Sequence, residues 1–196
     1  YLRQMGAKIY AETCPQYLTL SKDTAMGVLV QIAPPLREEA DINCLWQAAA
    51  AGTIDTIGSD HCLRYRRLKE EAGVWDAAPG LGGVGAILPI MMSEGVNKGR
   101  ITIEQLVKLT SENAARIWGI YPKKGTLSVG ADADIAVVDP KQEWVLSANN
   151  LKSASDYSAY EGRRVKGKVI RTYVRGELVA EDGNLVKEIP MGKYVY

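Results

Sequence analysis

The spacing of hydrophobic and polar residues predicts alternating strands and helices in the first part of the chain. Residues 8–13 alternate in polarity after Gly6, which predicts a strand that follows the last turn of a helix closed by that glycine. The Ala-rich stretch 37–51 predicts a helix that ends at Gly52, and residues 53–59 predict a second strand. A strand, a helix and a strand with short connections favour parallel pairing through a right-handed crossover.

A long loop and two further helices are predicted to follow. Residues 61–83 are polar and then glycine-rich, without sustained periodicity, which is typical of a loop that covers a site. Residues 87–95 and 102–119 have helical spacing, with Thr102 as the N-cap of the second helix and Gly119 at its end. The first part of the chain therefore has the pattern of an α/β barrel or a doubly wound sheet.

Beyond Gly125 the pattern changes to short strands separated by Gly, Pro and Asn. The strand-like runs cover residues 134–139, 143–146, 165–174 and 178–180. The dipeptide Arg175-Gly176 between two of these runs predicts a hairpin turn. We therefore predict an α/β protein with two parts, an α/β part at residues 1–122 and a β-rich part at residues 123–196.

Composition and charge argue against several classes of partner. The chain has 24 Lys and Arg residues against 23 Asp and Glu residues, so we expect no broad attraction to nucleic acid or to an anionic membrane. The apolar stretch at 84–92 is broken by Gly85 and Pro89 and is shorter than the roughly 20 residues that span a bilayer. Three separated cysteines favour a reducing, cytoplasmic setting. Because there is no initiator methionine or signal peptide, we expect the chain to begin inside a longer protein.

Asp60 is the leading candidate for chemistry, because it follows a predicted parallel strand at the edge where α/β barrels build active sites. An Asp in this position is also typical of a helix N-cap or a loop acceptor. His61 is the single histidine of the sequence, so this chain cannot assemble a cluster of imidazole ligands, and a structural role for His61 stays open. Cys62 has no second histidine to activate it, so we interpret it as a buried or lining thiol.

Two other features of the predicted loop have less specific interpretations. Its glycine-rich stretch 80–83 does not join a strand to a phosphate-binding helix, so we expect no nucleotide site. A short basic cluster is followed at once by Glu70 and Glu71, and we interpret the cluster as a solvated face. The cluster consists of Arg64, Arg66, Arg67 and Lys69.

An ordered series of motifs covers nearly the whole chain. The first three are Glu12-Thr13-Cys14-Pro15-Gln16-Tyr17-Leu18, Ala33-Pro34-Pro35-Leu36-Arg37 and Gly58-Ser59-Asp60-His61-Cys62. Further motifs are Gly80-Leu81-Gly82-Gly83-Val84, Asn113-Ala114-Ala115-Arg116-Ile117-Trp118-Gly119 and Gly130-Ala131-Asp132-Ala133-Asp134-Ile135. In order and spacing the series resembles the cyclic amidohydrolase family of dihydropyrimidinases, hydantoinases, allantoinases and dihydroorotases.

The resemblance implies a fold and a metal site. Residues 1–122 would be the C-terminal part of a TIM-like (β/α)8 barrel, and residues 123–196 would contribute strands to a small β-sandwich. Asp60 would be both a metal ligand and the catalytic group that carries a proton to the leaving ring nitrogen. In the family, two divalent ions, usually zinc, activate the attacking water. Their other ligands would precede Tyr1, so we expect this chain alone to be inactive.

The resemblance also implies that backbone groups at Ala33, Pro79 and Gly80 bind the substrate ring. Ala33 stands where the dihydropyrimidinases and hydantoinases have a serine, and backbone contacts survive that change. Pro79 stands where they have an asparagine, and it has no N–H to donate. The leading substrate is a hydantoin or dihydropyrimidine ring, with allantoin and dihydroorotate as alternatives.

Two hypotheses from other classes stay open. The chain could belong to a non-catalytic family member that keeps the fold as a scaffold. It could also be an incomplete fragment whose open parallel strands are covered in an oligomeric scaffold. Our leading hypothesis is a hydrolase that acts on a small cyclic amide, forms a homo-oligomer, and has neither nucleic acid nor membrane as a partner.

Overall fold

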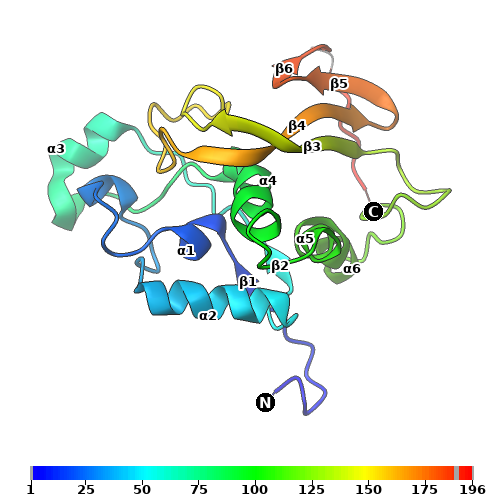
Figure 1. The fold of residues 1–196 in the computed structure, drawn as a ribbon, viewed down its shortest axis with the longest axis horizontal. Coiled ribbons are helices and arrows are strands. Elements are labelled where there is room, and N and C mark those ends of the chain that lie inside the picture. The colour runs from blue at the N-terminus through cyan, green and yellow to red at the C-terminus, as the bar shows by residue number, and fades with distance from the viewer. Residues whose placement is uncertain (1, 188–189, 196) are drawn as a thin grey trace.

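A layer of helices lies against an antiparallel sheet in the computed structural model, which describes residues 2–187 and 190–195 (Figure 1). The α-helices are α1 (Pro15–Thr19), α2 (Glu39–Ala50), α3 (Arg66–Asp76), α4 (Ile87–Ile90), α5 (Ile103–Val107) and α6 (Asn113–Ile117). Two short 3-10 turns are η1 (Gly27–Val30) and η2 (Val84–Ala86), and two π-helical turns are η3 (Met91–Val96) and η4 (Lys108–Glu112). The strands are β1 (Glu12–Thr13), β2 (Thr56–Ile57), β3 (Ile135–Val145), β4 (Arg164–Val174), β5 (Glu177–Glu181) and β6 (Asn184–Leu185).

Strands β1 and β2 form the parallel pair that the sequence predicts. Glu12 lies opposite Thr56 and Thr13 lies opposite Ile57, with α2 between the two strands in the chain. Both strands are two residues long and thus shorter than the predicted runs 8–13 and 53–59. Each run is a strand only where the other run lies beside it, because a strand is defined by its hydrogen-bonded partner.

The predicted helix at 37–51 is α2, and its ends have clear causes. Glu38 and Asp41 form a reciprocal capping box, in which the Asp41 carboxylate accepts a 3.1 Å hydrogen bond from the Glu38 N–H. Gly52 follows the helix with a φ of +72°, as expected for a residue that ends a helix. The Trp46 indole donates a 2.8 Å hydrogen bond to the Leu18 carbonyl, which fixes α2 against α1.

The two predicted helices at 87–95 and 102–119 are present, and each contains a π-helical turn. Helix α4 continues into η3, while α5 continues through η4 into α6, which ends at Ile117. The predicted N-cap is confirmed, because Thr102 Oγ1 accepts a 3.2 Å hydrogen bond from the Gln105 N–H and the Gln105 side chain accepts one from Thr102. Gly119, with a φ of +73°, follows the last turn.

The prediction of an irregular loop at 61–83 is wrong for its middle, which forms α3 (Figure 1). Two ion pairs spaced four residues apart, Arg66–Glu70 and Arg67–Glu71, support this helix. The hydrophobic pattern does not predict this helix, because the apolar residues Leu68, Val74 and Trp75 are exposed and form no buried stripe along one face. The predicted end of a helix near Gly6 is a hydrogen-bonded turn at residues 2–6, and Tyr1 lies outside the described residues.

The four strands of the sheet follow one another in the order β3-β4-β5-β6, and all neighbours are antiparallel. The predicted runs 134–139 and 143–146 are one strand, β3, interrupted by a register shift between Asp139 and Glu143. The predicted hairpin turn is confirmed, because Arg175 and Gly176 join β4 to β5 with φ values of +49° and +82°.

The sheet and the helical layer share a hydrophobic core. One cluster lies within the helical layer and includes Leu18, Trp46 and Leu106. A second cluster joins Ile90 of the helical layer to Leu146 and other residues near the sheet. The division at residue 122 therefore crosses a common core, and it stays a prediction. Within the described residues, no helix is long and apolar enough to cross a membrane.

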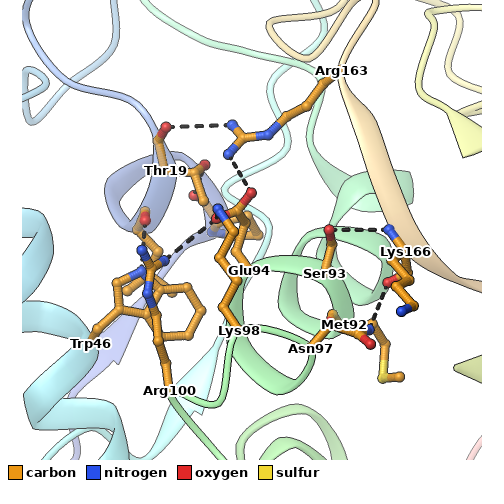
Figure 2. A network of polar contacts seen from close by, with 12 residues as sticks. Thr19, Trp46, Met92, Ser93, Glu94, Asn97, Lys98, Arg100, Arg163 and Lys166 are labelled. Atoms are coloured by element: carbon orange, nitrogen blue, oxygen red, sulfur yellow. Dashed lines mark hydrogen bonds and ion pairs between the residues drawn. The ribbon is translucent and has the colours of Figure 1, made fainter. Parts of the chain in front are cut away.

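A polar network around Glu94 also joins the two layers (Figure 2). The Glu94 carboxylate, on η3, accepts hydrogen bonds from Lys98 at 2.6 Å and from Arg163 at 2.8 Å, and Arg100 lies 3.5 Å away. Arg163 precedes β4 and also donates to the carbonyl of Thr19 at the end of α1. One buried carboxylate therefore connects the sheet with two parts of the helical layer.

Candidate functional site

Asp60 lies just beyond the carboxyl end of β2, and its side chain is exposed. Its φ of +45° falls in the left-handed region, which few residues other than glycine adopt and which aspartate tolerates better than most. The next residue, His61, forms an isolated parallel bridge with Leu81. The structure thus confirms the predicted location at a strand end, and the predicted catalytic and metal-binding roles of Asp60 stay predictions.

Cys14 and Tyr17, at the start of α1, lie within the electrostatic influence of Asp60. Burial raises the pKa of the Cys14 thiol to about 12, and the negative charges of Asp60 and Glu12 contribute to the increase. Burial also raises the pKa of the Tyr17 phenol, again with a contribution from Asp60. Both groups therefore stay protonated at neutral pH, and a Cys14 thiolate is not available as a nucleophile.

Glu12 is a second carboxylate at this edge, and the sequence alone predicts no role for it. It lies on β1 and accepts a 2.7 Å hydrogen bond from Thr56 Oγ1 on β2. A β-carbon at Gly58 would lie 2.5 Å from Glu12 Oε1, so the carboxylate occupies space that the glycine leaves free. The missed signal was Glu12 in the β1 motif, on the strand that pairs with the one preceding Asp60.

The segment that contains Asp60 lies beside the glycine-rich segment 80–83. The Cys62 N–H donates to the Leu81 carbonyl at 2.8 Å, and His61 Nδ1 accepts hydrogen bonds from the N–H groups of Gly83 and Val84. A β-carbon at Gly83 would lie 2.7 Å from the Ser59 carbonyl oxygen, so this close approach requires glycine. His61 therefore has a structural role, which is to hold the glycine-rich segment against the end of β2.

The three predicted substrate-binding positions lie on two segments at this same edge. Near Ala33, the carbonyl of Pro34 accepts a 2.9 Å hydrogen bond from the Tyr17 hydroxyl. Tyr17 is the residue whose pKa is raised by burial and also by the charge of Asp60. Gly80 packs closely against Cys62, since a β-carbon on Gly80 would lie 2.8 Å from Cys62 Cβ. The structure thus gathers the segments of Ala33, Pro79 and Gly80 beside the end of β2. Contact between these residues and a substrate stays a prediction.

The backbone groups of Pro79 and Gly80 already have protein partners. The Pro79 carbonyl accepts a 3.2 Å hydrogen bond from Arg64, and the Gly80 N–H donates to the Gln31 carbonyl at 3.1 Å. The Gly80 carbonyl accepts a 3.0 Å hydrogen bond from Lys69. A ring bound here would have to share these carbonyls, each of which has a second lone pair.

Asp60 fits a divalent cation as one oxygen ligand. Among residues 2–187 and 190–195, no three or more His, Cys, Asp or Glu side chains form a group that could hold a metal ion. An exposed carboxylate at a strand end can coordinate a cation, but a complete site needs about four ligands. The described residues therefore do not complete such a site around Asp60.

Two cavities of about 540 and 430 Å3 lie between the helical layer and the sheet. The first is bounded by residues such as Leu88 and Trp144, and the second by residues such as Leu106 and Ile135. Asp60 lines neither cavity. The candidate site is therefore located by the strand end and its polar groups, and it lies outside these two cavities.

Comparison with known proteins gives consistent matches over almost the whole chain. The sequence model of the amidohydrolase family matches residues 16–179. The chain is 40% identical to an L-hydantoinase of Paenarthrobacter aurescens and 39% identical to a D-hydantoinase of Geobacillus stearothermophilus. These alignments cover 97% and 98% of this chain but 42% and 43% of the relatives. The chain therefore spans less than half the length of the curated relatives it matches.

The fold is similar to that of a solved L-hydantoinase (dihydropyrimidinase) from Arthrobacter aurescens. The TM-score is 0.91 at 39% sequence identity, over 95% of this chain and 42% of that protein. A solved D-hydantoinase gives a TM-score of 0.88 at 38% identity. These likenesses confirm the predicted fold class, the C-terminal part of a TIM-like α/β barrel followed by strands of a small β-sandwich.

Proposed function

Because this chain belongs to the amidohydrolase family, we propose that it supplies the C-terminal part of an enzyme that hydrolyses a cyclic amide, with hydantoin or a dihydropyrimidine as the ring. The observation that carries the proposal is the exposed Asp60 carboxylate beyond β2, beside the segments of Ala33 and Gly80. The hydantoinase relatives support this ring class. Allantoin and dihydroorotate are the alternative substrates.

In this proposal Asp60 carries the proton of the reaction. Two bound divalent ions, zinc in our proposal, would lower the pKa of the attacking water and polarise the ring carbonyl. The Asp60 carboxylate accepts the proton of that water and delivers it to the ring nitrogen as the C–N bond breaks. This delivery is needed because an unprotonated amide nitrogen is a poor leaving group.

The surroundings of Asp60 suit this role. Burial and the negative charges of Asp60 and Glu12 raise the pKa of Cys14, so its thiol adds no second negative charge beside the carboxylate at neutral pH. Asp60 would be one metal ligand and also the catalytic acid and base. The other ligands would come from the part of the relatives that this chain does not cover, and for this reason we expect no hydrolysis by this chain alone.

We also infer a homo-oligomer and a cytoplasmic location. The parallel pair β1-β2 has open backbone edges that must be covered, either by the barrel strands that this chain lacks or by another subunit. The second arrangement is the one that supports an assembly of several chains. Cys14, Cys44 and Cys62 are all free thiols, which supports a reducing compartment.

A joined enzyme tests the proposed function. This chain would be fused to the N-terminal part of the Paenarthrobacter aurescens L-hydantoinase that the alignment leaves uncovered. We expect the fusion, loaded with zinc, to open hydantoin or dihydrouracil, and neither part to do so alone. Allantoin and dihydroorotate would be assayed in parallel to decide the ring. A folded fusion that binds zinc and opens none of the four rings would contradict the proposal.

A further inference from the structure

Lys69, on α3, is a buried cation that the proposed function does not use. Its side chain is 1% exposed, so the interpretation of the basic cluster as a solvated face is wrong for this residue. The interpretation is correct for Arg66 and Arg67, which are exposed. Lysine is seldom fully buried without a partner, because desolvation of an ammonium group costs free energy.

The Lys69 ammonium donates to three backbone carbonyls. The acceptors are the oxygens of Leu29 at 3.2 Å, Gln31 at 3.0 Å and Gly80 at 3.0 Å. An ammonium group has three N–H donors, so its hydrogen-bonding capacity is used completely. The ion pairs within the described residues include no carboxylate partner for Lys69, and the cation beside it, Arg64, carries the same charge.

The three acceptors connect the two segments that we propose face the substrate. Gln31 lies two residues before Ala33, and Gly80 directly follows Pro79. The Gln31 carbonyl accepts from Lys69 and also from the Gly80 N–H, at 3.1 Å. Lys69 therefore joins both segments at a single point, from the side of α3.

We propose that Lys69 is a positioning residue that holds these two backbone segments together and thereby fixes the ring-binding edge beside Asp60. The effect of Lys69 on substrate binding rests on the proposed function. The connection between the two backbone segments rests on geometry alone. Packing does not explain the residue, because methionine is also long and unbranched and would fill the site without a buried charge. A lysine is suited to this position because its three donors can hold three carbonyls at once.

The charge of Lys69 depends on pH within an accessible range. Burial lowers its pKa to about 8, Arg64 adds to the decrease, and Cys62 opposes it. Tyr157, whose pKa burial raises to about 12, donates to the same Leu29 carbonyl and stays protonated over this range. The segments 27–31 and 77–83 contribute no titratable side chain. Above pH 8 the amine loses one donor, so the connection between the two segments weakens.

Amide hydrogen exchange tests the connection without any assay of activity. In Lys69→Met, we expect the exchange of the Gly80 N–H to accelerate by about tenfold, as for the loss of one hydrogen-bonded contact. The Leu106 N–H in α5 should keep its rate. The matched control is Lys108→Met, which makes the same change at an exposed helical position and should leave Gly80 unaffected. Unchanged exchange at Gly80 in a folded Lys69→Met protein would overturn the proposal.

The unsubstituted protein provides a second measurement that does not depend on how a variant folds. The amide resonance of Gly80 should shift with pH, with a midpoint near the Lys69 pKa of about 8. In Lys69→Met this midpoint should be absent. A Gly80 resonance that does not respond between neutral pH and pH 9 in the unsubstituted protein would contradict the connection.

The joined enzyme tests the consequence for the substrate. We expect Lys69→Met to raise KM about tenfold, to change kcat by less than about twofold, and to retain its zinc, because ring binding and not proton transfer is affected. The KM of the unsubstituted enzyme should rise above pH 8, and that of the variant should not. An unchanged KM with accelerated Gly80 exchange would refute the role in ring binding. A joined enzyme that opens no ring would instead refute the proposed function.

Discussion

The antiparallel sheet and the strand end that carries Asp60 are stabilised in different ways. Strands β3 to β6 pair in chain order, so backbone hydrogen bonds between neighbouring segments build the sheet. Strands β1 and β2 pair over two residues, and beyond them isolated backbone hydrogen bonds and several side chains hold the backbone. Gln16 donates to the Ser59 carbonyl, His61 accepts from Gly83, and Lys69 binds three carbonyls.

This difference predicts where single substitutions matter. A backbone ladder tolerates many side-chain changes, because the hydrogen bonds belong to the main chain. The strand end has no such ladder, so one side chain can determine the position of a whole segment. The sheet therefore provides a stable support, and the specificity of the candidate site depends on few residues.

The largest expected effect on stability tests whether the two regions form one folding unit. Leu146 follows β3, is fully buried, and belongs to the cluster that also contains Ile90. Leu146→Ala should cost about 2–5 kcal/mol, because it leaves a cavity in the shared core. Urea unfolding followed by circular dichroism and by tryptophan fluorescence should give a single transition, shifted equally by both probes. Two separate transitions would show that the regions unfold independently.

A second substitution removes the polar connection between the layers. Glu94 is 8% exposed and accepts from Lys98 and Arg163 (Figure 2). Glu94→Gln should cost about 1.5–3 kcal/mol, because the buried position loses the charge-assisted hydrogen bonds from Lys98 and Arg163. Urea unfolding at neutral pH measures this loss, and Glu143→Gln, at an exposed position of β3, is the matched control.

The same carboxylate predicts a dependence of stability on pH. Burial would raise the pKa of Glu94, but hydrogen bonds from Lys98 and Arg163 outweigh burial and lower it below the ordinary 4.5. The folded state therefore binds this proton less readily than the unfolded state. The stabilisation is complete above pH 4.5 and is lost as the pH falls through the lower folded value. Glu94→Gln should lack this part of the acid sensitivity, and equal acid profiles would contradict the assignment.

The smallest expected effect concerns a local cap. Thr102→Ala should destabilise the protein by about 1 kcal/mol, because the Gln105 N–H at the start of α5 loses its acceptor. Thr102→Ser keeps the hydroxyl and should retain most of the stability. Thermal unfolding of the two variants would separate the contribution of the capping hydroxyl to stability from that of the methyl group. Equal losses in both would show that the hydroxyl has no part in stability.

The features that could be predicted from the sequence are those set by local chemistry. The Thr102 cap, the Arg175-Gly176 turn and the end of α2 at Gly52 each depend on a few adjacent residues. The location of Asp60 at a strand end follows from the strand that precedes it. In these places the residue that determines the backbone conformation lies within a few positions of the backbone that adopts it.

The features that were missed depend on distant contacts. Helix α3 exposes its apolar residues and is anchored by Lys69, a residue type that hydrophobic patterns assign to solvent. The hydrogen bonds that stabilise a buried lysine there depend on carbonyls of residues 29–31 and of Gly80, which are distant from it in the sequence. The contribution of Glu12 is similar, because it requires the pairing of β1 with β2.

The most direct test of the central claim is the turnover of Asp60→Asn in the joined enzyme. The amide has the shape of the carboxylate but cannot accept and return a proton, so kcat for ring opening should fall by about 10²- to 10⁴-fold. Asp60→Ala should fall at least as far, while Asp76→Asn, an exposed acid at the end of α3, should keep full activity. Thermal unfolding should show that all three variants fold. More than a few per cent of the original turnover in Asp60→Asn would contradict the role of Asp60 as the proton carrier.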